Sequence, residues 1–189
     1  IKKQLDEIEH VIFANFTHKP AIQLANRLSK ITPEGLEKSF FFSYWSSAVE
    51  IALKMAFKAH KIKGNNRKKF VGLSGGYHGE TLGSMSLVGK NKYNESFNEL
   101  MFDSLVAKAP DCYRCDLEKE SCNVKCFEDM KNKIENNYDD LAAVIFEPIC
   151  QGAAGMNIYS EKYLKKLEKN CKKYDIFMIA DEIAMGFGR

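Results

Sequence analysis

The chain contains two short apolar runs, Leu141-Ala-Ala-Val-Ile-Phe146 and Ile176-Phe-Met-Ile-Ala180. Between them, residues 161–173 place apolar side chains at helical spacing, and Ser160 is suited to cap the start of that helix. Runs that are apolar on both faces are typical of parallel strands buried under helices. The strand-helix-strand order therefore predicts an α/β fold with a mostly parallel sheet and helices on both faces.

Upstream segments extend the same pattern. Phe70-Val-Gly-Leu73 is predicted to be a strand that leads into a loop over residues 74–79. Ser39-Phe-Phe-Phe-Ser43 is predicted to be a short buried strand before a helix, and Ser47-Ala-Val-Glu50 fits the capping box that would open this helix. Further helices are expected over residues 20–28, 80–87 and 127–134.

Composition narrows the classes of protein to consider. Of the 189 residues, 45% are hydrophobic and 28% charged, which excludes a disordered tail and a disulfide-dense mini-protein. No apolar stretch approaches the roughly 20 residues of a membrane span, and the charged N-terminus does not resemble a signal peptide. We therefore expect a cytoplasmic protein with reduced thiols and no membrane partner. The formal charge of +3 and the basic residues 58–69, which lack interleaved aromatic side chains, do not indicate a nucleic-acid partner.

Acidic residues follow two of the predicted strands. Glu147 comes directly after the first apolar run, and Asp181 directly after the second. Because ligands of open α/β sheets bind outside the carboxyl ends of the strands, both carboxylates are expected at one crevice. Strand-end acids are more often caps or loop residues, but small-residue runs follow both of these and would let a ligand approach the backbone.

Three features together describe a site for pyridoxal phosphate. A shielded carboxylate would keep a ring nitrogen protonated, and Tyr77 in the loop Gly75-Gly-Tyr-His-Gly79 would stack on the ring. A helix N-terminus that carries Ser46 and Ser47 would receive the phosphate. The spacing of these residues along the chain does not by itself establish such a site. The alternative interpretation is that they have various structural roles.

Several ordered motifs resemble the class III pyridoxal-phosphate aminotransferases, and the resemblance covers essentially the whole chain. Asp181-Glu-Ile-Ala-Met-Gly-Phe-Gly-Arg189 resembles their cofactor-binding strand signature, and Gly75-Gly-Tyr-His-Gly-Glu-Thr81 their ring-stacking loop. Glu147-Pro-Ile-Cys-Gln-Gly-Ala-Ala-Gly-Met156 resembles the segment between them. Residues 10–24 are most similar to the branch that converts 7-keto-8-aminopelargonate to 7,8-diaminopelargonate in biotin synthesis.

The resemblance implies a fold-type-I large domain, a smaller domain and a homodimer. It implies transfer of an amino group from S-adenosylmethionine, or from lysine in members with a cysteine-bearing insertion, to 7-keto-8-aminopelargonate. By resemblance Asp181 pairs with the pyridine nitrogen, Tyr77 contacts cofactor and substrate, and Ser46 lies at the phosphate. Glu147 would help to order the site without contacting the cofactor itself, and His78 would adjoin the cofactor pocket.

Two departures from the family matter. Trp45 stands where the family has a glycine that lets the phosphate approach the backbone, so we expect weakened phosphate affinity. The family's Schiff-base lysine lies beyond Arg189, and no lysine in the chain follows a matching motif. No catalytic residue is therefore assigned, and residues 1–189 are expected to be a partial large domain that is inactive alone. The chain, which lacks the small domain, is expected to be either a fragment of a longer enzyme or a degenerate non-catalytic copy.

Residues 1–38 are expected to be an N-terminal lead-in, and residues 105–128 a cysteine-rich insertion. Cys112, Cys115, Cys122 and Cys126 have spacing that would allow a tetrahedral metal site, although the second pair is wider than in a zinc ribbon. A surface insertion with reduced thiols is the preferred interpretation, with no metal. A 4-aminobutyrate- or ornithine-type transaminase is the alternative enzyme.

Overall fold

The computed structural model describes residues 1–115 and 122–188, and the chain divides into two units, residues 1–41 and 42–189. The first unit holds α1 (Lys2–Glu7) and α2 (Lys19–Leu28). Pro20 lies in the first turn of α2, and the His18 side chain caps it by accepting a hydrogen bond from the Ala21 N–H at 3.3 Å. The helix predicted from Pro20 is thus confirmed.

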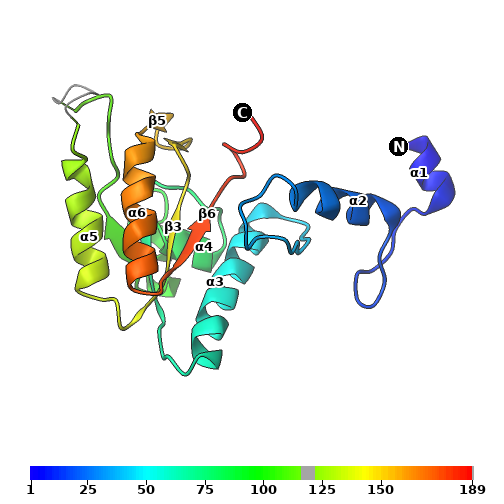
Figure 1. Ribbon diagram of the computed structural model, residues 1–189, viewed down its shortest axis with the longest axis horizontal. Coiled ribbons are helices and arrows are strands. Elements are labelled where there is room, and N and C mark those ends of the chain that lie inside the picture. The colour runs from blue at the N-terminus through cyan, green and yellow to red at the C-terminus, as the bar shows by residue number, and fades with distance from the viewer. Residues whose placement is uncertain (116–121, 189) are drawn as a thin grey trace. The chain divides into compact units, whose positions relative to one another are not determined.

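Four segments of the second unit form one sheet with the order β2-β1-β3-β6, in which all neighbouring strands are parallel (Figure 1). The strands are β1 (Lys69–Leu73), β2 (Leu105–Ala107), β3 (Leu141–Phe146) and β6 (Phe177–Ala180). Every residue of β3 is buried, which explains why this strand is apolar throughout. The α/β class and the parallel pair of the last third are confirmed.

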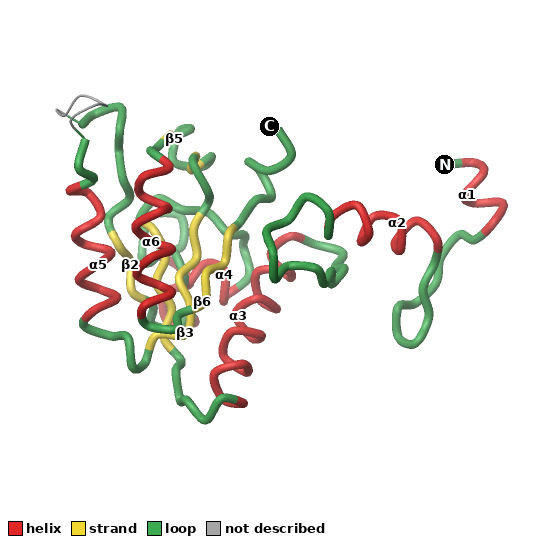
Figure 2. The backbone as a smooth tube through the Cα atoms, in the orientation of Figure 1, coloured by secondary structure: helices red, strands yellow, loops and turns green. Residues whose placement is uncertain are grey.

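Helices cover both faces of this sheet, as Figures 1 and 2 show. On one face lie α5 (Glu128–Glu135) and α6 (Glu161–Lys173), and on the other lies α3 (Trp45–Ile62), which packs against α4 (Leu82–Ser86). The remaining elements are η1 (Glu95–Leu100), η2 (Lys125–Phe127) and the antiparallel pair β4 (Cys150–Gln151) and β5 (Asn157–Ile158). Among the described residues, no helix is both long and apolar enough to span a membrane.

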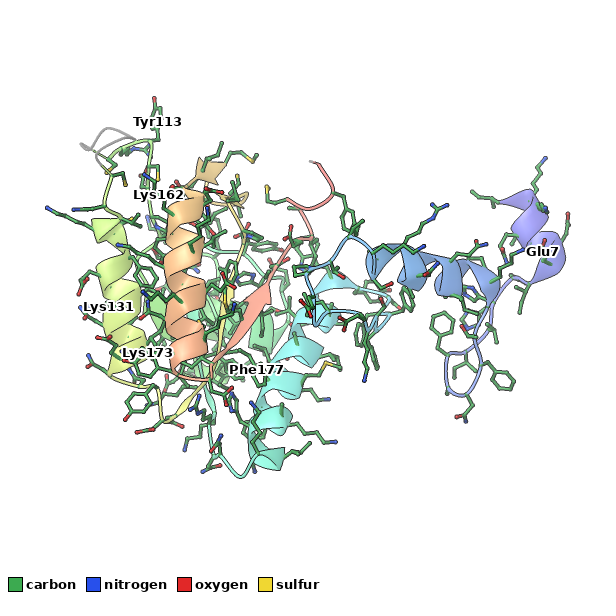
Figure 3. The ribbon with its side chains drawn as sticks, viewed as in Figure 1. Glu7, Tyr113, Lys131, Lys162, Lys173 and Phe177 are labelled. Carbon is green, nitrogen blue, oxygen red and sulfur yellow. The ribbon has the colours of Figure 1, made fainter. Side chains whose placement is uncertain are left out.

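The pleat of β1 divides the core into two clusters. Val71 and Leu73 pack with α5 and α6, whereas Phe70 packs with α3 on the opposite face. Successive side chains of a strand point to opposite faces, so one short apolar run serves both layers. Phe177 of β6 lies beside α3 (Figure 3), with its ring 4.8 Å from that of His60. Cys150 and Cys171 are buried, as expected for core residues.

Two local predictions are wrong. Residues 39–43 form no strand, because they do not pair with any strand of the described sheet. The predicted capping box is also absent, since α3 begins at Trp45, with Tyr44 as its N-cap residue. Glu50 instead accepts a hydrogen bond from the Gly83 N–H of α4 at 2.8 Å. A tertiary partner therefore takes the carboxylate that the local pattern assigned to its own helix.

The cysteine-rich segment begins later than the sequence predicts. Residues 105–107, expected to open the insertion, are β2 and pair with β1 at the edge of the sheet. Val124 and Phe127, near its other end, belong to the buried core. The part of this segment that leaves the core therefore lies between these points, and residues 116–121 fall outside the described chain.

Candidate functional site

Three loops leave the carboxyl ends of β1, β3 and β6 on the same side of the sheet. They comprise residues 74–81, 147–156 and 181–188. The chain runs from β1 outward to β2 and then returns to β3 on the other side of β1, so the strand order reverses between β1 and β3. A crevice at such a reversal is the usual ligand site of open α/β sheets. The carboxylates predicted from sequence both lie at this edge.

Glu147 ties the first two loops together. Its Oε1 accepts a hydrogen bond from the Tyr77 N–H at 3.0 Å, and its Oε2 accepts one from the Gly152 N–H at 2.9 Å. The side chain is buried, and this burial raises the pKa of the Glu147 carboxyl against the opposing effect of the two amides. These contacts suit the supporting role predicted for Glu147, because they fix the backbone that carries Tyr77.

Asp181 is paired with His78 at the carboxyl end of β6. The His78 Nδ1 lies 2.8 Å from Asp181 Oδ2, and the Ile183 N–H donates to Asp181 Oδ1 at 3.2 Å. Asp181 is 8% exposed and His78 is 1% exposed. A carboxylate partner favours the tautomer with the proton on Nδ1, so the ring donates to Asp181. The histidine expected to adjoin the pocket therefore holds the acid in place.

Tyr77 projects from the turn that Glu147 holds. Its hydroxyl donates a hydrogen bond to Glu80 Oε1 at 2.8 Å, and this bond raises the pKa of the phenol. The ring meets the Trp45 indole edge-on, with centroids 5.5 Å apart and planes at 90°. The same turn thus presents an aromatic ring and, in His78, the partner of Asp181.

The start of α3 approaches this turn. Trp45 and Ser46 are its first two residues, and no side chain caps the helix, so its first-turn amides lack intrahelical acceptors. A Cβ added to Gly79 would lie 2.4 Å from the Ser46 Cβ and 2.6 Å from the Trp45 Nε1. Gly79 has φ of +111°, so both its conformation and its surroundings require glycine. Trp45, Ser46 and Tyr77, which the sequence assigns to the cofactor site, therefore lie close to one another.

The sequence did not indicate two supporting contacts, one made by Gln151 and one by Glu50. Gln151 is fully buried and donates from its Nε2 to the Ser74 carbonyl oxygen at 3.2 Å, which adds a second link between the loops after β1 and β3. Glu50 links α3 to α4 through Gly83, where its carboxylate fills the space that a Cβ would need. A glutamate inside an amphipathic helix and a glutamine in a loop give no signal of such distant partners.

A cavity of about 710 Å³ borders the Tyr77 turn. Residues 74–80 form one wall, residues between Met85 and Asn94 form another, and Ala153 and Ala154 come from the loop after β3. Within the described chain, the buried His78 Nε2 has no hydrogen-bond partner. Tyr77, His78 and Glu80 thus line a space large enough for a small molecule.

The four clustered cysteines are free thiols in the described chain. Cys112, Cys115 and Cys126 are exposed, and Cys122 is partly buried. Burial, and then the three neighbouring thiols, raise the pKa of Cys126. No three metal-ligating side chains of the described residues are arranged to hold a metal ion. Reduced thiols without a metal therefore stay a prediction for this segment.

The residues present suit the ring of pyridoxal phosphate. Asp181 accepts one hydrogen bond at each oxygen, and a carboxylate has about four acceptor sites, so it can still receive a ring N–H. Its burial would make that charge pairing strong. Ser46 and the start of α3 suit a phosphate, but the Trp45 indole crowds the same corner. The part of the site around Asp181, here called the ring end, therefore suits the cofactor ring. At the part around Ser46 and the start of α3, here called the phosphate end, the Trp45 indole reduces the space for a phosphate.

Comparison with known proteins gives one consistent family. The model of the aminotransferase class-III family matches residues 1–189. The chain is 38% identical over 193 residues to the adenosylmethionine-8-amino-7-oxononanoate aminotransferase of Geobacter sulfurreducens, covering 100% of this chain and 43% of that protein. It is 40% identical over 195 residues to the enzyme of the same name from Staphylococcus aureus, again covering 100% of this chain and 43% of the relative.

Solved structures of transaminases resemble this chain along its whole length. The adenosylmethionine-8-amino-7-oxononanoate aminotransferase of Methanocaldococcus jannaschii superposes with a TM-score of 0.88 at 36% identity, covering 99% of this chain and 40% of that one. An omega transaminase from Pseudomonas jessenii in complex with PMP gives 0.87 at 32% identity, covering 100% and 43%. The chain thus spans about two fifths of the length of these relatives. It belongs to the class III aminotransferases.

Proposed function

We propose that this chain forms part of the large domain of a pyridoxal-phosphate enzyme that transfers an amino group to 7-keto-8-aminopelargonate, giving 7,8-diaminopelargonate for biotin synthesis. The amino donor is S-adenosylmethionine or lysine. The relatives that share 38–40% identity along the whole chain carry the name of this activity, which supports the proposal. As the chain spans only 43% of those relatives, the activity is proposed for the complete enzyme, as a homodimer.

The observation that carries the proposal is the buried Asp181–His78 pair beside Tyr77. A carboxylate at 8% exposure needs compensation for its lost hydration, and His78 with the Ile183 N–H supplies it. A buried acid with spare acceptor capacity, next to an aromatic ring, suits a flat ligand with a protonated ring nitrogen.

Each residue has a defined task in this proposal. When bound, pyridoxal phosphate carries the amino group between donor and acceptor and withdraws electrons from the carbon that loses its proton. Asp181 holds the proton on the ring nitrogen, and His78 keeps its carboxylate oriented. Tyr77 packs on the ring and contacts substrate, and Glu147 fixes the Tyr77 backbone. Ser46, with the first-turn amides of α3, receives the phosphate.

The test is an amino-transfer assay of the complete enzyme that contains this chain. We expect product from 7-keto-8-aminopelargonate with S-adenosylmethionine or lysine, and comparison of the two identifies the donor. Turnover with 4-aminobutyrate or ornithine alone would favour the alternative class III transaminases. Trp45 favours the alternative of a degenerate copy, which would bind the cofactor weakly and transfer no amino group with any donor.

A further inference from the structure

Trp45 lies at a corner that two parts of the proposed cofactor site share. Its indole packs edge-on against the Tyr77 ring at 5.5 Å. Its Nε1 also lies 2.6 Å from the place that a Cβ of Gly79 would occupy, beside the Ser46 Cβ. The indole therefore fills the angle between the first turn of α3 and the Tyr77–Gly79 turn.

The proposed function gives this corner to the phosphate and the Tyr77 ring to the cofactor. Trp45 touches both, so the indole and the phosphorylated ligand compete for the same contacts. The indole is 44% exposed and is not part of either buried core cluster. Because this side chain is already largely exposed and lies outside the core clusters, we expect that it can turn toward solvent without opening the core.

We propose that Trp45 is a specificity-determining residue: its indole occupies the phosphate end of the site, so that the site distinguishes poorly between a phosphorylated pyridine ligand and its unphosphorylated form. This inference rests on the proposed function. In the complex with the phosphate ester, the indole leaves the Tyr77 ring. A glycine at position 45 leaves the corner open, and the first-turn amides of α3 then reach the phosphate oxygens.

The first measurement is equilibrium binding of pyridoxamine phosphate and of pyridoxamine, which carry no aldehyde and so do not react with lysines. We expect W45G to bind pyridoxamine phosphate about tenfold more tightly than the wild-type chain and pyridoxamine within about twofold. W45F, which keeps an aromatic ring at the corner, should retain the wild-type ratio. W45A separates the loss of the ring from the helix cost of glycine, and should resemble W45G.

The second measurement uses fluorescence, since Trp45 is the only tryptophan of the 189 residues. The emission of the wild-type chain minus that of W45F isolates this side chain. We expect pyridoxamine phosphate to shift that difference spectrum to longer wavelength, as the indole moves into water, and pyridoxamine to shift it much less.

The outcomes separate this inference from the proposed function. If D181N weakens both ligands but W45G leaves the affinity ratio unchanged, the role of Trp45 is overturned while the cofactor site stands. An unshifted emission spectrum at saturating pyridoxamine phosphate also overturns it. If D181N leaves the affinity for both ligands unchanged in the wild-type and W45G chains, the proposed cofactor site itself fails. Thermal unfolding of each variant checks that the fold is retained.

Discussion

The two ends of the candidate cofactor site are built differently. At the ring end, the carboxylates of Glu147 and Asp181 are buried, and all four of their oxygens accept hydrogen bonds from other parts of the site. At the phosphate end, Trp45 is exposed and Ser46 is half-buried, and no side chain caps α3. The ring end is held by a network of hydrogen bonds, whereas the phosphate end consists of an uncapped helix start and one exposed indole.

Because the two ends differ in burial, substitutions at each end should weaken ligand binding to different extents. When a buried carboxylate is substituted, the groups that were hydrogen-bonded to it stay buried. Water cannot reach them to replace the missing partner, so the substitution is costly in free energy. An exposed side chain at a helix start can rearrange while water satisfies the backbone. We therefore expect large effects at the ring end and selective effects at the phosphate end.

The largest expected effect is at Asp181. D181N removes the charge that would hold a protonated ring nitrogen, so we expect pyridoxamine phosphate to bind about 100-fold more weakly. Equilibrium dialysis of the ligand measures this change. D175N is the matched control, since Asp175 pairs with Lys63 on the surface, and its affinity should stay within about twofold of wild type. Equal affinity of D181N and wild type would contradict the ring-end assignment.

A smaller loss is expected at His78, which we treat as a positioning residue for Asp181. H78L removes the donor to Asp181 Oδ2, and we expect about tenfold weaker binding of pyridoxamine phosphate. H78N keeps a donor near the position of Nδ1 and should restore most of the affinity. Rescue by H78N but not by H78L distinguishes positioning from simple packing. The idea fails if both variants lose affinity equally while remaining folded.

The contribution of Glu147 to the stability of the ring end should depend on pH. Burial raises the pKa of its carboxyl in the folded state, so the folded chain holds this proton more tightly than the unfolded chain. The corresponding stability is present below the ordinary glutamate pKa and is lost as pH rises through the raised value. The free energy of unfolding of wild type minus that of E147Q should therefore fall with rising pH, by at most about 1.4 kcal/mol per pH unit.

Urea unfolding across the weakly acidic range measures that slope. E161Q is the control, because the exposed Lys165 lowers the pKa of Glu161 and the sign is reversed. Its contribution is present above the ordinary glutamate pKa and is lost as pH falls. A wild-type advantage over E147Q that grows with rising pH would refute the assignment.

The smallest effect is expected outside the site, at the cysteine-rich segment. The thiols of Cys112, Cys115, Cys122 and Cys126 are not arranged around a common metal position in the described chain. If these thiols are reduced and metal-free, as the preferred interpretation of the sequence has it, a chelator should leave the thermal unfolding midpoint unchanged, and metal analysis should find far less than one ion per chain. Stoichiometric zinc with a chelator-sensitive midpoint would contradict this prediction, since structural zinc contributes directly to folding.

Much of the fold could be predicted because it depends on local patterns. The runs at 141–146 and 176–180 and the amphipathic helix between them appear in the structure as β3, β6 and α6, with Ser160 as the N-cap. Strand length, helical period and cap chemistry are properties of adjacent residues. The wrong predictions concern segments whose structure depends on tertiary contacts rather than on adjacent residues. Residues 39–43 have strand-like composition but are not part of the sheet that the described residues form, and Glu50 bonds α4 rather than its own helix.

The candidate site divides in the same way. Glu147 and Asp181 could be placed at the ligand edge, because each directly follows an apolar run that forms a parallel strand. The pairing of His78 with Asp181 could not be predicted, because the two residues are 103 positions apart. The link from Gln151 to Ser74 spans 77 positions and was missed for the same reason.

The strand-helix order, the parallel sheet and the acids at its carboxyl edge follow from the amino-acid sequence, since they depend on periodicity and residue chemistry. Which groups share the low-dielectric interior depends on the folded chain. It set His78 against Asp181, joined Tyr77 to Gly152 through Glu147, and placed the Trp45 indole between α3 and the Tyr77 ring. Burial fixes such pairings because an unpaired polar group away from water is costly, and burial is a property of the folded chain alone.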